Sequence, residues 1–449
     1  MSKISVLMVL ACLTGCSVGP NYKRPPLATT DGYPLPDMAA DEQNLVPGAS
    51  PSQWWQGFGS PSLDALVEQA QRQSPTVLAA AARLKAARED LQAEKGALWP
   101  SVSIGQDQTQ QAYSSVPGGT GTFYNVTTQS VSVSYGFDLL GGERRTIEGK
   151  AARSGYARYE QVAASQSLSA NVVTTAINVS ALAEQAEASS DIIVSQQALL
   201  VLIRGQIQAG SVGQEDLLSA QARLSNQQAN LNAIRRDLAQ AQHRLAVLVG
   251  RSPLEAVAVD WKLADLTLPR DLPVSLPSSL VEQRPDILAQ EARLRQASAD
   301  VGVAEANMLP HLTLDGNYST SVWYLTNHLW QPIFAGGSLN AQRKSAIDAY
   351  EGAGADYRAA VLGAFQDVAD VLTALDTDNK SCSFAMTRLS NSKSNLALME
   401  ARFAAGSVSR MALLTQSQDY QQARINALKA SADRYADTVA LYLSLGGNW

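Results

Sequence analysis

One cysteine carries the clearest chemistry in this sequence. The chain begins MSKISVLMVLACLTGC, in which a basic residue, Lys3, precedes a short apolar run and small residues lead to Cys16. The run is too short to span a bilayer, which is typical of a secretory signal. The stretch Leu13-Thr14-Gly15-Cys16 has the pattern of a bacterial lipoprotein signal, in which the cysteine becomes the first mature residue and carries the lipid. We therefore expect residues 1–15 to be removed and a covalent lipid on Cys16. The alternative is an ordinary signal peptide that happens to contain a cysteine.

No other arrangement of reactive residues in the sequence suits catalysis or metal binding. The three histidines, His243, His311 and His328, share no ligand spacing, and there is no Ser/His/Asp set, phosphate-binding loop or CxxC pair. His243 is better explained as a helix-surface residue than as a metal ligand. With Cys16 acylated, Cys382 has no disulfide partner and is most simply a small packing residue. We expect a protein that is not an enzyme and needs no cofactor besides its lipid.

The composition favours long helices and argues against nucleic acid as a partner. The 449 residues are 45% hydrophobic and 17% charged, with a net charge of −6. Ala, Gln, Ser and Leu dominate, as in long helices, and the basic residues are not clustered, so no nucleic acid is expected to bind. No segment after the signal has about 18 consecutive apolar residues, so we expect no transmembrane helix. Attachment to a membrane would then need a lipid anchor, a β-barrel contribution, or both.

The sequence contains one unit twice. Residues 74–104 align with 284–314 at an offset of 210 without gaps, and identical residues include Pro75/Pro285 and Leu84/Leu294. Further along, QAGSVGQEDLL at 208–218 matches AAGSVSRMALL at 404–414 at an offset of 196. Such self-similarity predicts a duplicated structural unit. Each GSV phrase interrupts a stretch that is otherwise helical, which predicts the tip of a helical hairpin.

Each copy predicts a helix ended near a proline, a pair of β segments, a very long helix and a shorter returning helix. For the first repeat, 62–250, we expect helices over 62–98, 143–207 and 214–248 and strands over about 101–113 and 126–139. For the second repeat, 285–449, we expect helices over 285–309, 338–403 and 409–444 and strands over about 311–320 and 324–334. The segments 16–61 and 251–284 are an N-terminal mature segment and a linker. The longest helices would measure roughly 95 Å at 1.5 Å per residue, which predicts a rod with coiled-coil-like packing.

The β segments have the pattern of barrel strands. In SVSVSYGFDL, residues 130–139, apolar and polar side chains alternate strictly, which predicts a strand with one apolar face. Two hairpins in one chain supply only four strands, too few to close a transmembrane barrel, whereas a trimer would supply twelve. The alternative is a small soluble sheet that caps a helical rod. Export, a lipid anchor and the apolar face favour the barrel.

Several stretches together resemble one family. The resemblance is carried by CSVGPNYKRP (16–25), SQWWQGFGSPSLDALVEQA (52–70), EQRPDILAQEARLRQASADVGVAEANMLPHLTL (282–314), QPIFAGGSL (331–339) and both GSV phrases. The chain resembles the outer-membrane factors of tripartite efflux systems, the TolC-like and OprM-like proteins, in their lipoprotein (NodT-type) branch. The resemblance covers essentially the whole mature chain.

This resemblance implies the fold, the partners and the location of the protein. The fold is mainly α with a transmembrane β-barrel contribution, and a homotrimer forms a 12-stranded barrel and a periplasmic α-helical tunnel. A belt around the tunnel includes 16–61 and the 251–284 segment. Outer-membrane lipid surrounds the barrel, and the tips meet a periplasmic adaptor coupled to an inner-membrane pump of RND or MFS type. The tip residues implied for that contact are Gly210, Ser211, Val212, Glu215, Asp216, Gly406, Ser407, Val408 and Arg410.

Two features depart from the pattern of many relatives. An acidic residue often follows the Leu-Leu pair after the second tip, but this chain has Thr415 there. Arg402 and Phe403, just before the tip, fit the basic and aromatic gate positions of the family better, so we take all three as candidates for the pore constriction. The other departure is the second hairpin, 311–337, which leaves almost no room for an outer loop. Either that loop is very short or its strands are truncated.

We expect a passive exit duct for drugs or other small toxic compounds, lipid-anchored in the outer membrane and reaching into the periplasm. One alternative within the family is a duct for type I protein secretion. Another, of a different class, is a periplasmic coiled-coil lipoprotein that spaces the envelope layers without a pore. The two tips differ in charge, because Glu215 and Asp216 make one acidic while Arg410 makes the other basic. In a trimer we expect acidic and basic tips to alternate around the entrance.

Overall fold

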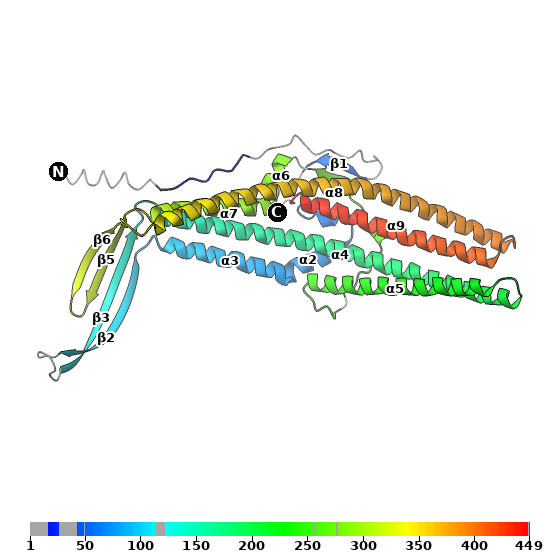
Figure 1. Cartoon of the computed structure of the whole chain (residues 1–449), viewed down its shortest axis with the longest axis horizontal. Helices are drawn as coiled ribbons and strands as arrows, with labels where there is room; N and C mark the ends of the chain where they lie inside the picture. The colour runs from blue at the N-terminus through cyan, green and yellow to red at the C-terminus, as the bar shows by residue number, and fades with distance from the viewer. Residues whose placement is uncertain are drawn as a thin grey trace. The chain divides into compact units, whose positions relative to one another are not determined.

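A computed structural model describes residues 17–26, 43–48, 50–113, 122–255, 257–274, 277–447 and 449. In chain order the elements (Figure 1) are β1 (Asn44–Pro47), η1 (Trp54–Phe58), α2 (Pro61–Gln73), α3 (Pro75–Gly96), β2 (Ser101–Tyr113), β3 (Thr122–Phe137), α4 (Gly142–Gln208), α5 (Gln214–Leu248), η2 (Leu263–Asp265), β4 (Asp271–Val274), α6 (Pro277–Gln283), α7 (Pro285–Ala306), β5 (His311–Ser319), β6 (Trp323–Trp330), α8 (Ser338–Ala404) and α9 (Arg410–Ser444).

The mainly helical fold with long helical hairpins and β-hairpins is confirmed. The helices α4 and α8 have 67 residues each, and the helices that return from them, α5 and α9, have 35 residues each. At 1.5 Å per residue, a helix of 67 residues is about 100 Å long. The same order of a long helix, a tip and a shorter helix occurs in both halves of the sequence, as the duplicated phrases predict.

The expectation of one helix over 62–98 is wrong, because two helices, α2 and α3, occupy this stretch. Ser74 separates them with an extended backbone, φ −63° and ψ 124°. Proline has no N–H to donate and its ring pushes the preceding residue out of the helical region, so Pro75 begins a new helix. The Ala-rich pattern continues on both sides of this break, which is why periodicity alone did not reveal it. The same rule separates α6 from α7 at Pro285.

Four antiparallel strands form one sheet in the order β2-β3-β5-β6. The sheet joins the two repeats, because β3 of the first pairs with β5 of the second, from Ser130↔Ser319 to Phe137↔Leu312. The sequence left two possibilities for the second hairpin, a very short loop or truncated strands, and the structure has both. Its strands have 9 and 8 residues against 13 and 16 in the first hairpin. Its turn is tight as well, since Ser319 N–H donates to the Val322 carbonyl at 2.8 Å.

One face of this sheet is apolar. Directly paired residues of antiparallel strands lie on the same face, and the pairs include Val102↔Val133, Ile104↔Val131, Tyr135↔Leu314, Phe137↔Leu312 and Leu312↔Leu329. In the single chain, Ile104 is 83% exposed and Leu329 is 70% exposed. A continuous exposed apolar face of this kind needs cover, and lipid supplies it in a transmembrane barrel.

The chain forms two compact units that do not coincide with the repeats. One unit comprises Met1–Leu27, Ala81–Glu160 and Asp286–Ala360, and the other comprises Ala28–Ala80, Gln161–Pro285 and Val361–Trp449. Each unit takes segments from both copies, because the long helices α4 and α8 each contribute to both units. The first unit contains the four-stranded sheet, and the second contains both hairpin tips.

The second unit has an aromatic-rich core at its N-terminal segment. Trp54 stacks on Tyr442 with ring centroids 5.3 Å apart, and Phe58, which is fully buried, lies 5.8 Å from Tyr435. Around them pack apolar residues of the surrounding helices, among them Leu63, Val67, Val172, Ile177, Leu245, Leu372 and Leu441. The second unit also contains a two-stranded parallel sheet, in which β1 pairs with β4. The motif SQWWQGF therefore packs into the helical core.

One helix, α4, has a stretch long and apolar enough to cross a membrane by length and composition, which the sequence reading did not anticipate. A single stretch of this kind is weak evidence for a membrane span, because the core helix of a soluble protein passes the same test. In the single chain, 33% of this apolar stretch is buried.

Candidate functional site

The first hairpin tip is closed by a glycine cap. Gly210 has φ 71°, and its N–H donates to the Ile207 carbonyl at 2.9 Å, while Ser211 N–H donates to the Gln206 carbonyl at 3.0 Å. These two bonds are the Schellman motif, which satisfies the last carbonyls of a helix and needs a residue in the left-handed region. A β-carbon on Gly210 would touch nothing. The requirement for glycine is therefore conformational rather than steric.

The second tip repeats this geometry bond for bond. Gly406 has φ 70°, and its N–H donates to the Phe403 carbonyl at 2.9 Å, while Ser407 N–H donates to the Arg402 carbonyl at 2.9 Å. The hydroxyls of the two serines, Ser211 and Ser407, also donate to the same carbonyls as their own amides. The duplicated GSV phrase thus encodes one cap, used twice.

The two returning helices begin in different ways. The N-cap of α5 is Gly213, whose lack of a side chain leaves the first turn without a side-chain cap, and Glu215 and Asp216 lie in that turn. Acidic residues there interact favourably with the helix dipole. The N-cap of α9 is Ser409, whose Oγ accepts from Ala412 N–H at 3.2 Å, and Arg410 follows it. The side-chain cap offsets the unfavourable interaction of Arg410 with the helix dipole. The charge of each tip is therefore compatible with the start of its returning helix.

An apolar cluster lies beneath the tips. Leu200, Ile203 and Ala220 are buried, and Ile207, Val212, Leu217, Leu224 and Met411 pack against them. Val212, one of the predicted tip residues, thus points its side chain into the hairpin. All members come from the first hairpin except Met411, which belongs to α9. Sequence reasoning missed Met411, although the alignment at offset 196 places it opposite the charged Glu215.

The candidates for the pore constriction lie on both sides of the second tip. Arg402 and Phe403 occupy the last turn of α8, where a basic residue interacts favourably with the helix dipole. Their backbone carbonyls accept the cap bonds, and the Phe403 side chain is 40% exposed. Thr415 is exposed on α9 and its hydroxyl donates to the Met411 carbonyl at 3.0 Å. The structure therefore places all three near the tip, with Val408 half-buried in the connecting loop.

Polar contacts join the two hairpins above the tips. The Arg424 guanidinium of α9 lies 3.0 Å from a Glu187 carboxylate oxygen and 3.8 Å from one of Glu184, both on α4. The Gln421 amide donates to Asp191 at 3.1 Å. From Arg424 to Gln421 the contact moves toward the tip on α9, and from Glu187 to Asp191 it moves toward the tip on α4. The two helices are therefore antiparallel neighbours along this seam.

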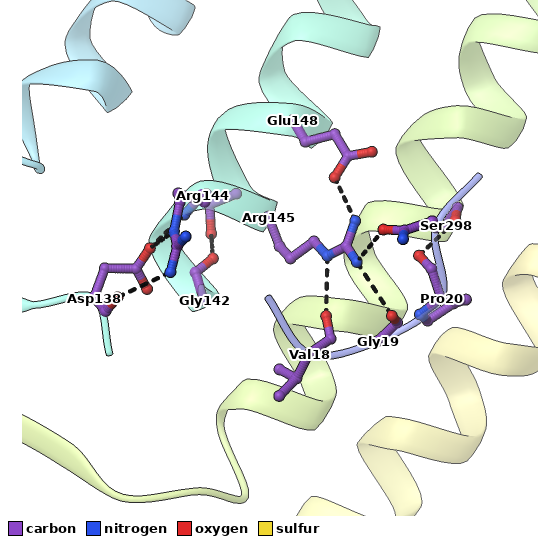
Figure 2. A network of polar contacts seen from close by, with 11 residues as sticks. Val18, Gly19, Pro20, Asp138, Gly142, Arg144, Arg145, Glu148 and Ser298 are labelled. Carbon is purple, nitrogen blue, oxygen red and sulfur yellow. Dashed lines mark hydrogen bonds and ion pairs between the residues drawn. The ribbon is translucent and has the colours of Figure 1, made fainter. Parts of the chain in front are cut away.

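The first unit holds the residues that follow Cys16 in a polar clamp (Figure 2). Arg145 of α4 is 3% exposed, and it donates to the carbonyls of Val18 and Gly19 at 2.9 and 3.1 Å and to Asn21 Oδ1 at 2.8 Å. Glu148 balances its charge at 2.7 Å. Because the guanidinium presents its donors in a rigid fork, it can grip several acceptors at once. Residues 17–24 are called the strap below.

A buried carboxylate grips the other end of the strap. Glu291 of α7 has a side chain only 2% exposed, and it accepts from Arg24 at 2.6 Å, from Tyr22 at 3.1 Å and from Arg295 at 2.5 Å. Burial and the neighbouring Glu291 raise the pKa of Tyr22 to about 12. Burial alone would raise the pKa of Glu291, but the hydrogen bonds from Arg24 and Arg295 outweigh it and lower that pKa. The two clamps thus account for Val18, Gly19, Asn21, Tyr22 and Arg24 in the motif CSVGPNYKRP.

The turn from β3 to α4 is built around Asp138. Its two carboxylate oxygens accept from the backbone N–H groups of Glu143 and Arg144, each at 3.1 Å, and from the Arg144 side chain at 2.9 Å. An acidic residue that caps the first N–H groups of a helix is favourable. A β-carbon on Gly141 would meet Ser17 at 2.6 Å, so the strap packs directly on this turn. Cys16 itself lies outside the described residues.

The described part of the second unit also contains a cavity of about 570 Å³ between α4, α5 and α9. Its lining includes Asn178, Asp237, Arg244 and Asp433, which form no arrangement of nucleophile and base. Among the described residues there is no group of three or more potential metal ligands.

Comparisons with known proteins agree on one family. The family described as "Outer membrane efflux protein" matches residues 66–251 and 276–447, well over half of the chain. The chain is 29% identical to the pyoverdine export outer membrane protein OpmQ of Pseudomonas putida, over 99% of this chain and 96% of that protein. It is 26% identical to the outer membrane protein OprJ of Pseudomonas aeruginosa, over the same shares of the two chains.

A solved structure agrees in fold. The CmeC outer membrane channel of Campylobacter jejuni superposes with a TM-score of 0.84 at 21% identity, over 96% of this chain and 95% of that one. At this level of identity the likeness concerns the fold.

Proposed function

Because the chain belongs to the outer membrane efflux protein family, whose members are channels rather than enzymes and form trimers within tripartite efflux pumps, we propose that it is the exit duct for drugs or other small toxic compounds. The protein is an outer-membrane efflux channel that extends into the periplasm. In our proposal it conducts passively: energy comes from an inner-membrane pump of RND or MFS type, and a periplasmic adaptor joins that pump to the tips.

The observation that carries the proposal is the open four-stranded sheet attached to long hairpins. Its outer strands, β2 and β6, are each paired on one side only among the described residues. Unpaired edges and an exposed apolar face are unfavourable in isolation, and three copies would pair them into a closed barrel of twelve strands. The same three copies would bring six hairpins together as the wall of a tunnel. The name of the similar OpmQ refers to pyoverdine export, which supports a small organic substrate for this chain too.

We propose that the tips form the adaptor surface. Gly210 and Gly406 shape two similar loops, and Ser211, Ser407 and Val408 lie in them. Glu215 and Asp216 are exposed on one tip and Arg410 is exposed on the other. In a trimer these charges would alternate around the entrance, and an adaptor would meet both kinds. Arg402, Phe403 and Thr415 are our candidates for the narrowest point of the pore.

We also propose that a lipid on Cys16 anchors the chain. The strap that begins at Ser17 packs on the turn at the foot of β3, where its Val18 N–H donates to the Leu140 carbonyl at 3.0 Å. That position, at the end of a proposed barrel strand, suits entry of an acyl chain into the membrane beside the barrel. Mass spectrometry of the mature N-terminus, with a Cys16→Ala variant as control, tests the lipid directly. A Cys16→Ala trimer that stays in the outer membrane is expected, because the barrel also anchors the chain.

Single-channel conductance of the purified trimer in a planar lipid bilayer tests the duct. We expect discrete current steps, and a deletion strain with increased susceptibility to a panel of small toxic compounds. A trimer that never conducts, together with an unchanged panel, would favour the periplasmic coiled-coil spacer. Loss of a secreted protein from the medium of the deletion strain, without a change in susceptibility, would favour type I protein secretion.

A further inference from the structure

We propose that Met411 is a latch that holds the second hairpin tip against the first and keeps the periplasmic end of the channel narrow. This inference rests on the proposed duct function. It starts from the apolar cluster beneath the tips, in which Met411 is the one member contributed by α9. The other members come from α4, α5 and the loop between them. Met411 therefore makes the apolar link between the two hairpins in this cluster.

The duplicated sequence shows that Met411 is a specific departure. At offset 196 its counterpart in the first copy is Glu215, which is exposed. Both positions lie in the first turns of a returning helix, where the helix dipole favours Glu215 but gives no reason for a methionine at 411. Methionine is flexible and fills irregular apolar gaps, which suits a side chain that must enter the cluster of another hairpin. A charged residue at the same place would have to leave it.

Polar contacts hold the same pair of helices further from the tip. Arg424 with Glu187 and Gln421 with Asp191 tie α9 to α4. The tip end of α9 has no such ion pair among the contacts of the described residues, and there the link is the Met411 side chain. Separation of the tips would therefore begin at Met411, while the polar contacts keep α9 against α4 further along the helices.

The α9 face that carries both links also carries two buried polar atoms without hydrogen-bond partners among the described residues. Met411, Gln418 and Gln421 are seven and three residues apart, a spacing that places them on one face of a helix. The Gln418 Nε2 and the Gln421 Oε1 are buried and have no hydrogen-bond partner among the described residues. Such atoms gain hydrogen bonds when water reaches them. Apolar insertion of Met411 favours the closed seam, and hydration of these amides favours its opening.

The test compares Met411→Glu, which copies the residue of the first repeat, with the volume-conserving Met411→Leu. Cysteines are introduced by Ser211→Cys and Ser407→Cys in a Cys382→Ala background and are labelled with nitroxides. Pulsed electron paramagnetic resonance of the full-length trimer then reports the distance between the tips. The matched control is Met386→Glu on α8, where the methionine is 46% exposed. Migration as a trimer on a native gel checks that each variant assembles.

We expect the label distance to lengthen in Met411→Glu and to stay unchanged in Met411→Leu and Met386→Glu. Met411 is half-buried, so loss of its apolar contact is expected to change the ratio of open to closed tips by up to about tenfold. The bilayer conductance of Met411→Glu should rise as well. An assembled Met411→Glu trimer with the original label distance would overturn the latch. If the distance lengthens but no variant and no wild-type trimer conducts, the latch stands and the duct function fails.

Discussion

The backbones of Gly19 and Gly302 lie directly against each other in the first unit. A β-carbon on Gly19 would come within 2.4 Å of the Gly302 Cα, and one on Gly302 would come within 2.8 Å of the Arg145 side chain. Gly19 also has φ 88°, a conformation that side chains disfavour. A side chain at Gly19 would therefore collide with the backbone of α7. A side chain at Gly302 would collide with Arg145, which donates to the strap carbonyls.

The glycine contact predicts that Gly302→Ala destabilises the protein even though alanine favours helices. The new methyl group overlaps Arg145, and overpacking of this kind costs about 1–3 kcal/mol. Gly352→Ala on α8 is the matched control, because its β-carbon meets nothing, and it should stabilise by about 0.5–1 kcal/mol. Thermal unfolding of the two variants checks the prediction. Equal stabilisation by both substitutions would mean that the strap moves aside without loss.

The polar clamp predicts that Arg145→Ala releases the strap. The substitution removes the charged donor that the carbonyls of Val18 and Gly19 and the Asn21 side chain share. A hydrogen bond to a charged group contributes about 1.5–3 kcal/mol. Lys23 is exposed within the strap and offers a site for trypsin. We expect faster cleavage there in the variant, measured by mass spectrometry. Arg88→Ala, an exposed residue of α3, serves as control, and equal cleavage rates in both variants would contradict the clamp.

A carboxylate on α9 predicts that stability falls as the pH rises toward neutral. Burial, followed by a hydrogen bond and repulsion from Asp378 and repulsion from Asp433, raises the pKa of Asp437 to about 7. The ordinary value is 3.8. Between these values the folded protein binds the proton more tightly than the unfolded chain, so the contribution is full at low pH and is lost as the pH rises through about 7.

Asp437→Asn tests this pH dependence, because asparagine cannot ionise. The variant should lose part of the decline in thermal stability between pH 5 and pH 8, whereas Asp419→Asn, at an exposed position of α9, should keep it. The slopes are compared by calorimetry across buffers of constant ionic strength. A wild-type curve that is flat over this range, or rises, would contradict the raised pKa.

The charged tips predict that charge reversal weakens adaptor binding, and that this weakening becomes smaller at high salt. Asp216→Lys and Arg410→Glu should each weaken the binding of the adaptor, and the loss should shrink at high salt because exposed charges are screened. Surface plasmon resonance of the full-length trimer with the purified adaptor measures this. Glu255→Lys, an exposed site far from the tips in sequence, is the control. Unchanged affinity in both tip variants would mean that the tip charges are only solvated and do not contribute to adaptor binding.

Local rules accounted for the features that one short stretch of sequence can specify. Gly210 and Gly406 could be identified as helix ends because a Schellman cap depends on a few consecutive residues and one backbone conformation. The length of the helices and the alternation of β3 followed from periodicity in the same way. The duplicated phrases extended these local conclusions to the second half of the chain.

Contacts between distant residues could be decided only by the tertiary structure. The break at Ser74 is different, because Pro75 is a local signal that the surrounding Ala-rich pattern concealed. Arg145 and Gly302 read as ordinary helix residues, and Met411 as one more methionine, because their partners are far away in the chain. The family, the hairpins and their glycine caps could be predicted from the sequence alone. Which side chains clamp the strap and link the hairpins depends on packing in three dimensions, where neighbours are set by the fold and not by spacing along the chain.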